Sequence, residues 1–544
     1  MTNKEVARIF NRLGKAMELH GENPFKIRSY GNDYNTIRRL PQEVTGLSRT
    51  ELESIKGIGK NIADKIEELR DTGNMATLQK YLDKTPPGIV EMLSIKGLGA
   101  KKILAVWKDL GIESPGELMY ACEENRLVEL KGFGAKTQES IRAQLVYYLD
   151  SKGKYLYGHI ADDLDQFLEE VGTRFQGARF SWTGDVLRQM PVVEKAVLQG
   201  TVPSDDFWSS ISSIMDNPSE GELEYKGVQI HYQVASEAEF DEVLFEHSSS
   251  DEFAGAWRAA YTGADLKKDD QSLFESLGLE YIPPESRELP DAIRRAKEGQ
   301  LQLIESEHIK GVVHNHSTYS DGANTLREMA EACIEGGYEY LVMSDHSKSA
   351  FYANGLNEDR VLQQMEEIDR LNKELQPFRI FKSIESDILY DGRLDYDDDL
   401  LGQFDLVIAS VHSNLKMNEE KATERIVTAV SHPATRILGH PTGRLLLSRS
   451  GYPLDHMAVI DTCAEHNVVI ELNANPYRLD LDWTWIPYAL EKGVKISINP
   501  DAHSTEGIKH IRWGVSAARK ALVRPEDCIN TLNLSEFTKW VGNP

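Results

Sequence analysis

Nine histidine and acidic side chains of types that bind metal ions lie at or just beyond the carboxyl ends of predicted strands. They are His314, His316, Asp321, His346, Glu385, His412, His440, Asp501 and His503. Imidazole with carboxylate suits Zn²⁺, Mn²⁺ or Fe²⁺, and this number of ligands exceeds what one ion can use. Because alternate residues of a strand share a face, His314 and His316 can hold one ion together, as can Asp501 and His503. The pattern predicts two or three divalent metal ions.

Apolar, β-branched segments position these residues. Strands are predicted at 309–316, 338–346, 378–388, 404–412, 435–441, 467–475 and 494–503. Helical segments such as 325–337 and 359–375 lie between most of them. Alternation of strands and helices predicts a parallel sheet or barrel. In a parallel α/β barrel, catalytic groups gather at the carboxyl ends of the strands.

The ligand candidates stand in sequence motifs that occur in a fixed order. These are HNHSTYSDG (314–322), SDHS (344–347), IESDIL (384–389), SVHS (410–413), HPTGRLL (440–446), NANPYRLDL (473–481) and PDAHS (500–504). They resemble the PHP (polymerase and histidinol phosphatase) domain, which implies a distorted seven-strand α/β barrel over 305–544 with a trinuclear metal centre. The resemblance implies a first metal on His314, His316, Glu385 and Asp501, a second on Glu385, His412 and His440, and a third on Asp321, His346 and His503.

Such a centre implies hydrolysis of phosphoesters. Two divalent ions acidify a water molecule between them, neutralise phosphate oxygens and stabilise the leaving alkoxide. Glu385, His412, His440 and Asp501 are the predicted catalytic ligands. Three basic side chains in the motif loops are candidates for binding the phosphate, with an ordinary surface charge as the alternative: Lys348, Arg444 and Arg478.

A Lys-Gly-apolar-Gly loop is repeated three times in residues 1–150. The copies are LESIKGIGKNIADKI (52–66), MLSIKGLGAKKILAV (92–106) and LVELKGFGAKTQESI (127–141). Each turn leaves the N–H groups of a following helix free for an anion. The loops resemble helix-hairpin-helix elements, which grip nucleic-acid phosphates without reading sequence. The predicted DNA-binding residues are Gly57, Gly59, Lys60, Gly97, Gly99, Lys101, Gly132, Gly134 and Lys136, with added charge from Lys56, Lys96, Lys102 and Lys131.

The order of these regions resembles the bacterial family X DNA polymerases over the whole chain. Residues 22–40, which carry four basic side chains among aromatics, resemble the small N-terminal domain of that family, although a solvated helix face is the alternative. The resemblance implies a multidomain chain. An all-α helix-hairpin-helix region at 1–150 precedes an α+β nucleotidyltransferase-like palm at 151–235, a thumb-like region at 236–304 and the barrel.

The palm lacks the acidic residues that polymerisation needs. The family has a Gly-Ser turn, an Arg pair and a Gly-Asp-x-Asp strand, with a third carboxylate on a later strand. Here Gly184 is followed by Asp185, and Leu187 replaces one Arg. The ungapped spacing places three residues without carboxylates at the metal-binding positions: Lys195, Val197 and His231. Because nucleotidyl transfer needs those carboxylates for Mg²⁺, we predict no DNA polymerase activity.

The net charge is unevenly distributed. The 544 residues carry 61 basic and 87 acidic side chains, a formal charge of −26. Residues 1–150 hold 23 basic and 21 acidic side chains, so this near-neutral region is the one expected to bind DNA, with modest and salt-sensitive affinity. No segment has the ~20 apolar residues of a membrane span. The start lacks a signal peptide, and the four cysteines form no C-x-x-C pair. A monomer in a reducing cytoplasm is expected.

The combined hypothesis is a DNA-binding phosphodiesterase of DNA repair that uses Mn²⁺ or Zn²⁺, or Fe²⁺. We expect 3′→5′ exonuclease or 3′-end processing of gapped, nicked or 3′-ended DNA, with cleavage at abasic sites as a further activity and repair proteins as partners. One alternative is an active family X polymerase with an associated exonuclease. Others are a small-molecule phosphatase of the histidinol-phosphatase type and a DNA-binding scaffold without catalysis.

Overall fold

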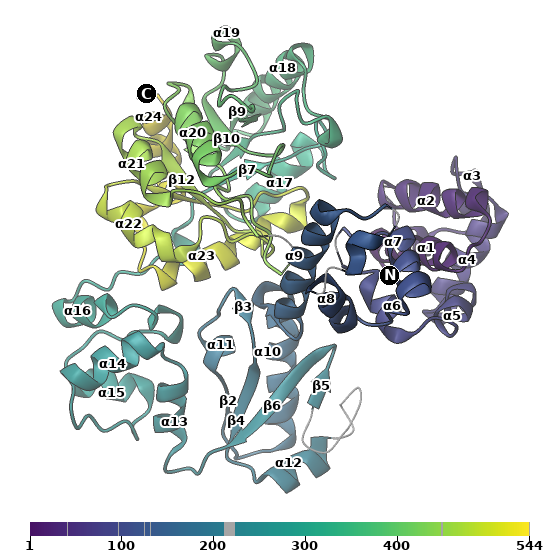
Figure 1. Cartoon of the computed structure of the whole chain (residues 1–544). Helices are drawn as coiled ribbons and strands as arrows, with labels where there is room; N and C mark the ends of the chain where they lie inside the picture. The colour runs from purple at the N-terminus through teal and green to yellow at the C-terminus, as the bar shows by residue number, and fades with distance from the viewer. Residues whose placement is uncertain are drawn as a thin grey trace. The chain divides into compact units, whose positions relative to one another are not determined.

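The chain divides into two compact units, Met1–Lys152 and Gly153–Pro544. The computed structural model shown in Figure 1 describes residues 1–40, 42–95, 97–123, 126–130, 132–211, 223–447 and 450–542. None of the helices in these ranges is long and apolar enough to cross a membrane.

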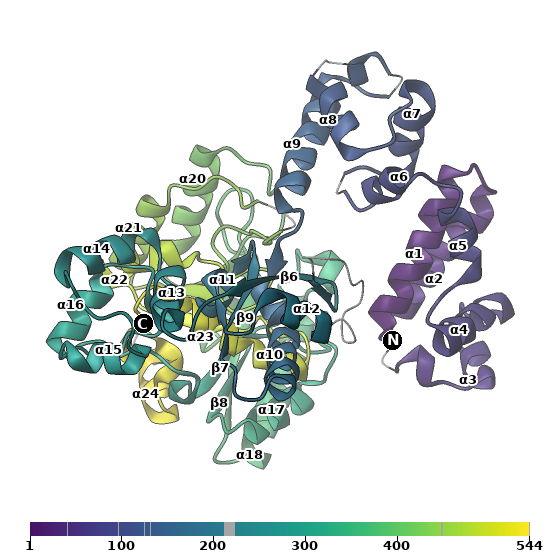
Figure 2. The same ribbon diagram turned by 90° about the horizontal axis from the view of Figure 1, so that it is seen from below.

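The first unit is all α-helical. A capping box between Thr2 and Glu5 starts α1, which lies side by side with α2 (Figures 1 and 2). Two apolar clusters form its interior, one around Phe10 and Ile62 and one around Ile103 and Leu118. The helices are α1 (Asn3–Leu19), α2 (Pro24–Arg38), α3 (Arg49–Ser54), α4 (Lys60–Thr72), α5 (Ala76–Leu82), α6 (Pro87–Met92), α7 (Ala100–Leu110), α8 (Pro115–Glu123) and α9 (Ala135–Ser151).

The second unit begins with a four-stranded sheet in the order β2-β4-β6-β5, in which β4 and β6 are parallel and the other pairs antiparallel. Leu164 and Phe167 of α10 pack on the sheet against Leu198 and Ile230. The strands are β2 (Phe180–Thr183), β4 (Ala196–Gly200), β5 (Leu223–Tyr225) and β6 (Val228–Val234), with a separate pair of β1 (Tyr155–Leu156) and β3 (Val192–Val193). The helices are α10 (Tyr157–Arg174), α11 (Gly184–Leu187) and α12 (Ser204–Ile211).

Four helices follow and pack around the buried ring of Trp257. Phe245, Phe253 and Phe274 surround that ring, with centroid distances of 5.0, 6.1 and 5.1 Å. The helices are α13 (Phe240–His247), α14 (Asp251–Ala260), α15 (Asp270–Ser276) and α16 (Asp291–Glu298).

A parallel seven-stranded sheet, β7 to β13 in chain order, forms the rest of the second unit. A parallel bridge between Asn315 and Ala502 brings the last strand back to the first, so the sheet is a nearly closed barrel. All seven predicted strands are confirmed. They are β7 (Gly311–Asn315), β8 (Tyr340–Met343), β9 (Arg379–Asp387), β10 (Leu406–Ser410), β11 (Thr435–Leu438), β12 (Val469–Asn473) and β13 (Ile496–Asn499).

Helices surround these strands (Figure 1), so the strands are buried on both faces, as their continuous apolar runs require. Within the barrel, Phe537 stacks on Tyr340 with the ring centroids 4.3 Å apart. The helices are α17 (Leu326–Glu335), α18 (Glu358–Glu374), α19 (Asp398–Leu401), α20 (Glu419–Val430), α21 (His456–His466), α22 (Ile486–Glu491), α23 (Ile511–Lys520) and α24 (Leu534–Val541).

Candidate metal centre

The structure brings the nine predicted ligands together at the carboxyl ends of the barrel strands. His314 lies within β7 and Glu385 within β9, whereas the others follow β7, β8, β10, β11 and β13. Their ligand atoms form four overlapping groups, in each of which all atoms lie within 4.8 Å of one another. The groups are His316, Asp321, His346 and His503; His314, Glu385 and His440; His314, His316 and Asp501; and His346, Glu385 and His412.

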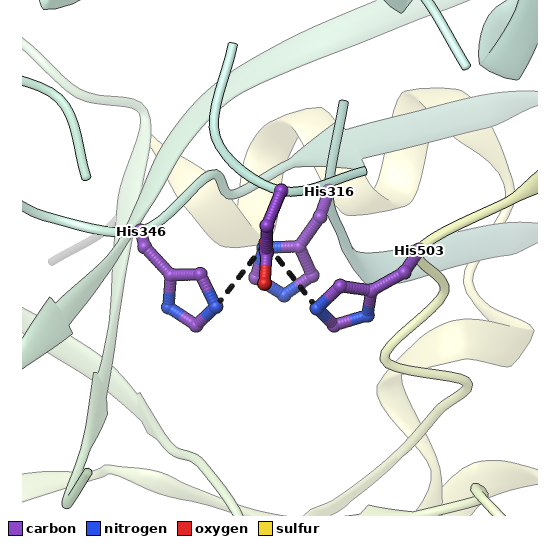
Figure 3. A group of neighbouring side chains, drawn as sticks. His316, His346 and His503 are labelled. Atoms are coloured by element: carbon purple, nitrogen blue, oxygen red, sulfur yellow. Dashed lines mark ion pairs between the residues drawn. The ribbon is translucent and has the colours of Figure 1, made fainter. Parts of the chain in front are cut away.

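Asp321 pairs with two imidazoles of the first group. Figure 3 shows the rings of His316, His346 and His503 converging, with dashed lines for the ion pairs of His346 and His503. Asp321 Oδ1 lies 3.6 Å from His346 Nε2 and 3.4 Å from His503 Nε2. Burial would raise the pKa of Asp321, but His503 and the other imidazoles lower it to about 2. The carboxylate is therefore ionised and suited to a cation.

Glu385 belongs to two of the three remaining groups. Its Oε1 lies 3.2 Å from His314 Nε2, 3.1 Å from His412 Nε2 and 2.9 Å from His440 Nε2. Its Oε2 lies 2.9 Å from His346 Nδ1. Despite complete burial, which raises a carboxyl pKa, the surrounding imidazoles hold the pKa of Glu385 well below its ordinary value. One carboxylate thus reaches two groups, as a bridging metal ligand does.

The centre fits metal ions because it contains buried polar atoms that the protein does not satisfy. His314 Nε2 and Glu385 Oε2 are buried and, although their ion-pair distances are 3.2 and 2.9 Å, neither makes a hydrogen bond of suitable geometry. Such an arrangement is costly unless another partner is bound. The backbone is also strained here, with φ of 63° at His314, 24° at His440 and 50° at Asp501. Positive φ at residues other than glycine is rare and gathers at functional sites.

Two carboxylates missed by the sequence reasoning orient the imidazoles. His314 donates from Nδ1 to Glu471 Oε1 at 2.6 Å, and His412 donates from Nδ1 to Asp387. Each bond leaves Nε2 directed at Glu385, in the way that a carboxylate bound to one ring nitrogen of a histidine leaves the other nitrogen to a metal. The signal was present in the sequence, because Glu471 interrupts the apolar strand NVVIELNAN and Asp387 lies in IESDIL.

Of the three predicted phosphate-binding residues, the structure places one at the centre. Arg478 Nε lies 3.5 Å from Asp501 Oδ2. Arg444 instead donates to the carbonyls of Arg478 and Leu479 and pairs with Asp482. Lys348 pairs with the exposed Glu358 at 2.7 Å. Arg478 is therefore the phosphate-binding candidate that the geometry supports.

The three repeated loops of the first unit share one backbone conformation. The first glycine of each has positive φ: 103° at Gly57, 84° at Gly97 and 88° at Gly132. The apolar residue between the glycines is buried and donates its N–H to the carbonyl three residues earlier in every copy. The second glycines precede α4, α7 and α9 without a side-chain cap, and the first turns of these helices carry the exposed lysines Lys60, Lys101 and Lys136.

The turns thus leave uncapped helix N–H groups beside positive charge, as phosphate binding requires. Lys56 is exposed and Lys102 partly exposed. Lys96 and Lys131 lie outside the described residues.

The three residues predicted to stand at the metal-binding positions of a palm lie together, and none of them is a carboxylate. Val197 on β4 and His231 on β6 are register partners, and Lys195 immediately precedes β4. Two acids close to Lys195 in the sequence have local partners: Asp185 accepts from the Glu194 N–H at 3.0 Å, and Glu194 pairs with Lys154. Among the described residues, every group of three or more His, Cys, Asp or Glu with metal-binding geometry lies in the barrel.

Comparisons with known proteins agree with this architecture. A helix-hairpin-helix domain model matches residues 1–75, and a SAM-like helix-hairpin-helix tandem model matches residues 89–146. The DNA polymerase/3′-5′ exonuclease PolX of Bacillus subtilis strain 168 is 33% identical over 99% of both chains. Probable phosphatases of Thermoanaerobacter sp. strain X514 and Syntrophotalea carbinolica are each 25% identical over 40% of this chain and about nine-tenths of their own.

Proposed function

This chain belongs to the bacterial family X DNA polymerases of the PolX type, and from that premise we propose that it is a DNA 3′→5′ exonuclease and 3′-end-processing enzyme without polymerase activity. The observation that carries the proposal is the contrast between two sites in one chain. All nine ligand positions of the barrel are filled and brought together, whereas the three palm positions hold Lys195, Val197 and His231. Its substrate is gapped, nicked or 3′-ended DNA, with abasic sites also cleaved.

In the proposed reaction, the barrel residues bind two or three divalent ions, Mn²⁺ or Zn²⁺, or Fe²⁺. When bound, such ions acidify water and offset the charge of a phosphate. Glu385 directs one oxygen toward His314, His412 and His440 and the other toward His346, so it holds ligands of two groups in fixed positions.

Side chains that contact the predicted ligands prepare the centre for a phosphodiester. Glu471 and Asp387 accept from the Nδ1 atoms of His314 and His412, which keeps both Nε2 atoms available. Arg478 presents a guanidinium beside Asp501, where it can donate to a phosphate oxygen. Attack of water on the phosphorus of the last phosphodiester would break the P–O3′ bond, so that the 3′-terminal nucleotide leaves as a 5′-monophosphate and the oxygen of the shortened strand takes up a proton as its new 3′-hydroxyl.

The remaining arginine of the palm turn supports loss of polymerase function. Arg188 Nη1 lies 3.0 Å from both oxygens of Glu288, and Nη2 lies 3.1 Å from Asp185. Two carboxylates therefore neutralise a side chain that would otherwise meet a triphosphate, and Asp185 adds a negative charge that repels one. The strands of the palm are retained while its chemistry is lost.

The helix-hairpin-helix turns supply DNA affinity that a small-molecule phosphatase does not need. Hydrolysis of small phosphate monoesters is nevertheless the second candidate function, because the probable phosphatases match only the barrel-sized part of the chain. Comparing kcat/KM on 3′-end DNA with kcat/KM on sugar and amino-alcohol phosphates tests the choice. Faster turnover of the monoesters would replace the proposal with the phosphatase function.

A further inference from the structure

The start of helix α10 packs directly on the barrel loop that carries Arg478. Gly158 is so close to this loop that an added Cβ would lie 2.9 Å from Pro476 and 3.1 Å from the Trp513 ring. The cavity left at this contact has a volume of about 10 Å³, enough for a single water molecule. The contact is therefore close-packed and has no room for a larger side chain at Gly158.

Aromatic and polar contacts extend this junction on both sides of Gly158. The ring of His159 meets that of Tyr477 edge to face with the centroids 4.5 Å apart, and Tyr157 meets Trp513 at 5.5 Å. Further along α10, Asp162 pairs with Arg512 at 2.9 Å. The palm-like region therefore touches both the loop that carries Arg478 and helix α23.

The loop itself is short and fixed from the barrel side. Asn475 accepts the N–H groups of Arg478 and Leu479 at 2.7 and 3.1 Å, and Arg444 donates to the Arg478 carbonyl. On the opposite side, Pro476 and Tyr477 meet α10. The two residues that meet α10 therefore immediately precede Arg478, whose guanidinium lies 3.5 Å from Asp501.

We propose that the palm-like region, although it lacks polymerase ligands, positions Arg478 for the barrel's phosphodiester hydrolysis, with Gly158 and His159 as the positioning residues. The inference rests on the proposed nuclease function. It gives the retained palm a role: α10 acts as a rigid support that sets the distance between the guanidinium and the phosphate. A 1 Å misplacement of a positioned group can cost about 100-fold in rate, so the packing at Gly158 bears on catalysis.

The test is a double-mutant cycle between Gly158→Ala and Arg478→Ala in the full-length, Mn²⁺-loaded protein. Gly172→Ala is the matched control, because it makes the same change on the same helix at an exposed position with no atom within 4 Å of the added Cβ. Single-turnover and steady-state degradation of 3′-end-labelled DNA give kcat and KM. Bound metal and the thermal melting temperature are measured alongside.

We expect Arg478→Ala to lower kcat/KM about 100-fold, as loss of one charge-stabilising donor does. Gly158→Ala should lower it about 10-fold in the native background and less than about 2-fold in the Arg478→Ala background, because both act through one contact. Metal content and melting temperature should match those of Gly172→Ala. His159→Ala, which removes a contact without inserting an atom, should lower kcat/KM in the same non-additive way.

Three outcomes overturn the inference. Activity of Gly158→Ala and His159→Ala equal to that of Gly172→Ala would show that the contact does not matter. An equal loss in both backgrounds would show that it does not act through Arg478. A chain that degrades no DNA in any background would remove the proposed function itself, and this inference with it.

Discussion

Replacing Glu471 by Gln should weaken metal binding although the residue is not a predicted ligand. Its side chain is fully buried on β12, and each of its two carboxylate oxygens accepts hydrogen bonds from two donors. His314 Nδ1 and Asn499 Nδ2 lie 2.6 and 2.8 Å from Oε1, and the His440 N–H and Asn473 Nδ2 lie 2.7 and 3.3 Å from Oε2. A glutamine of the same shape must turn its NH₂ group toward one of these donor pairs.

The size of the effect follows from this mismatch. A buried donor without an acceptor costs about 1–3 kcal/mol, and the substitution also removes the negative charge that favours His314 Nδ1–H. If the imidazole instead adopts the other tautomer, its Nε2 carries the proton and no longer binds a metal. Loss of a second-shell partner typically weakens metal binding about 10–100-fold, which is about 1.4–2.7 kcal/mol.

Competition with a chromophoric chelator measures the Mn²⁺ or Zn²⁺ affinity of the variant. Glu491→Gln on α22, which makes the same change at an exposed position, is the control. Circular dichroism and thermal melting establish that both variants fold. Metal affinity of Glu471→Gln equal to that of Glu491→Gln would refute the positioning role of Glu471.

Three further predictions address the metal ligands and the DNA-binding turns. His316→Ala or Glu385→Ala should abolish DNA degradation but leave DNA binding in a gel-shift assay intact; retained degradation contradicts the assigned centre. Metal affinity should strengthen as pH rises toward about 9. Burial lowers the pKa of His412 and His503, but neighbouring carboxylates raise the two pKa values to about 10 and about 9. Both rings must therefore release protons to bind metal. Calorimetry in buffers of different ionisation enthalpy detects that release. Removing the charges of Lys60, Lys101 and Lys136 should reduce the salt slope of DNA affinity by about 0.9 per lost phosphate contact on duplex DNA; an unchanged slope contradicts phosphate binding at these turns.

The sequence predicts the barrel well because both the strands and the arrangement of the strands leave a clear pattern in it. Seven apolar runs of strand length identify the elements, and the parallel arrangement then brings their carboxyl ends to one rim. His316 and His503, which are 187 positions apart in the sequence, have ring centroids 4.2 Å apart as a result. The sequence predicts the repeated loops equally well, since the pattern of an apolar residue between two glycines recurs three times.

The sequence does not reveal which side chains are already engaged in hydrogen bonds with a neighbouring loop. Arg444 and Arg478 look equivalent in their motifs, yet Arg444 is bound to carbonyls of the loop that carries Arg478. Glu471 stands out in the sequence only as an acid within an apolar strand, and its role depends on donors from β7, β13 and the residues after β11 that meet only in the folded barrel. Packing such as that between Gly158 and Pro476 joins segments more than 300 residues apart, so no local pattern can predict it.

An end-labelled gapped duplex, incubated with the full-length protein, Mn²⁺ and all four deoxynucleoside triphosphates, tests the central claim most directly. The nine clustered barrel ligands and the palm without carboxylates predict that the labelled strand becomes shorter from its 3′ end, and that Glu385→Ala stops the shortening. Lengthening of the strand that persists in Glu385→Ala and is lost on substitution in the palm would contradict the account.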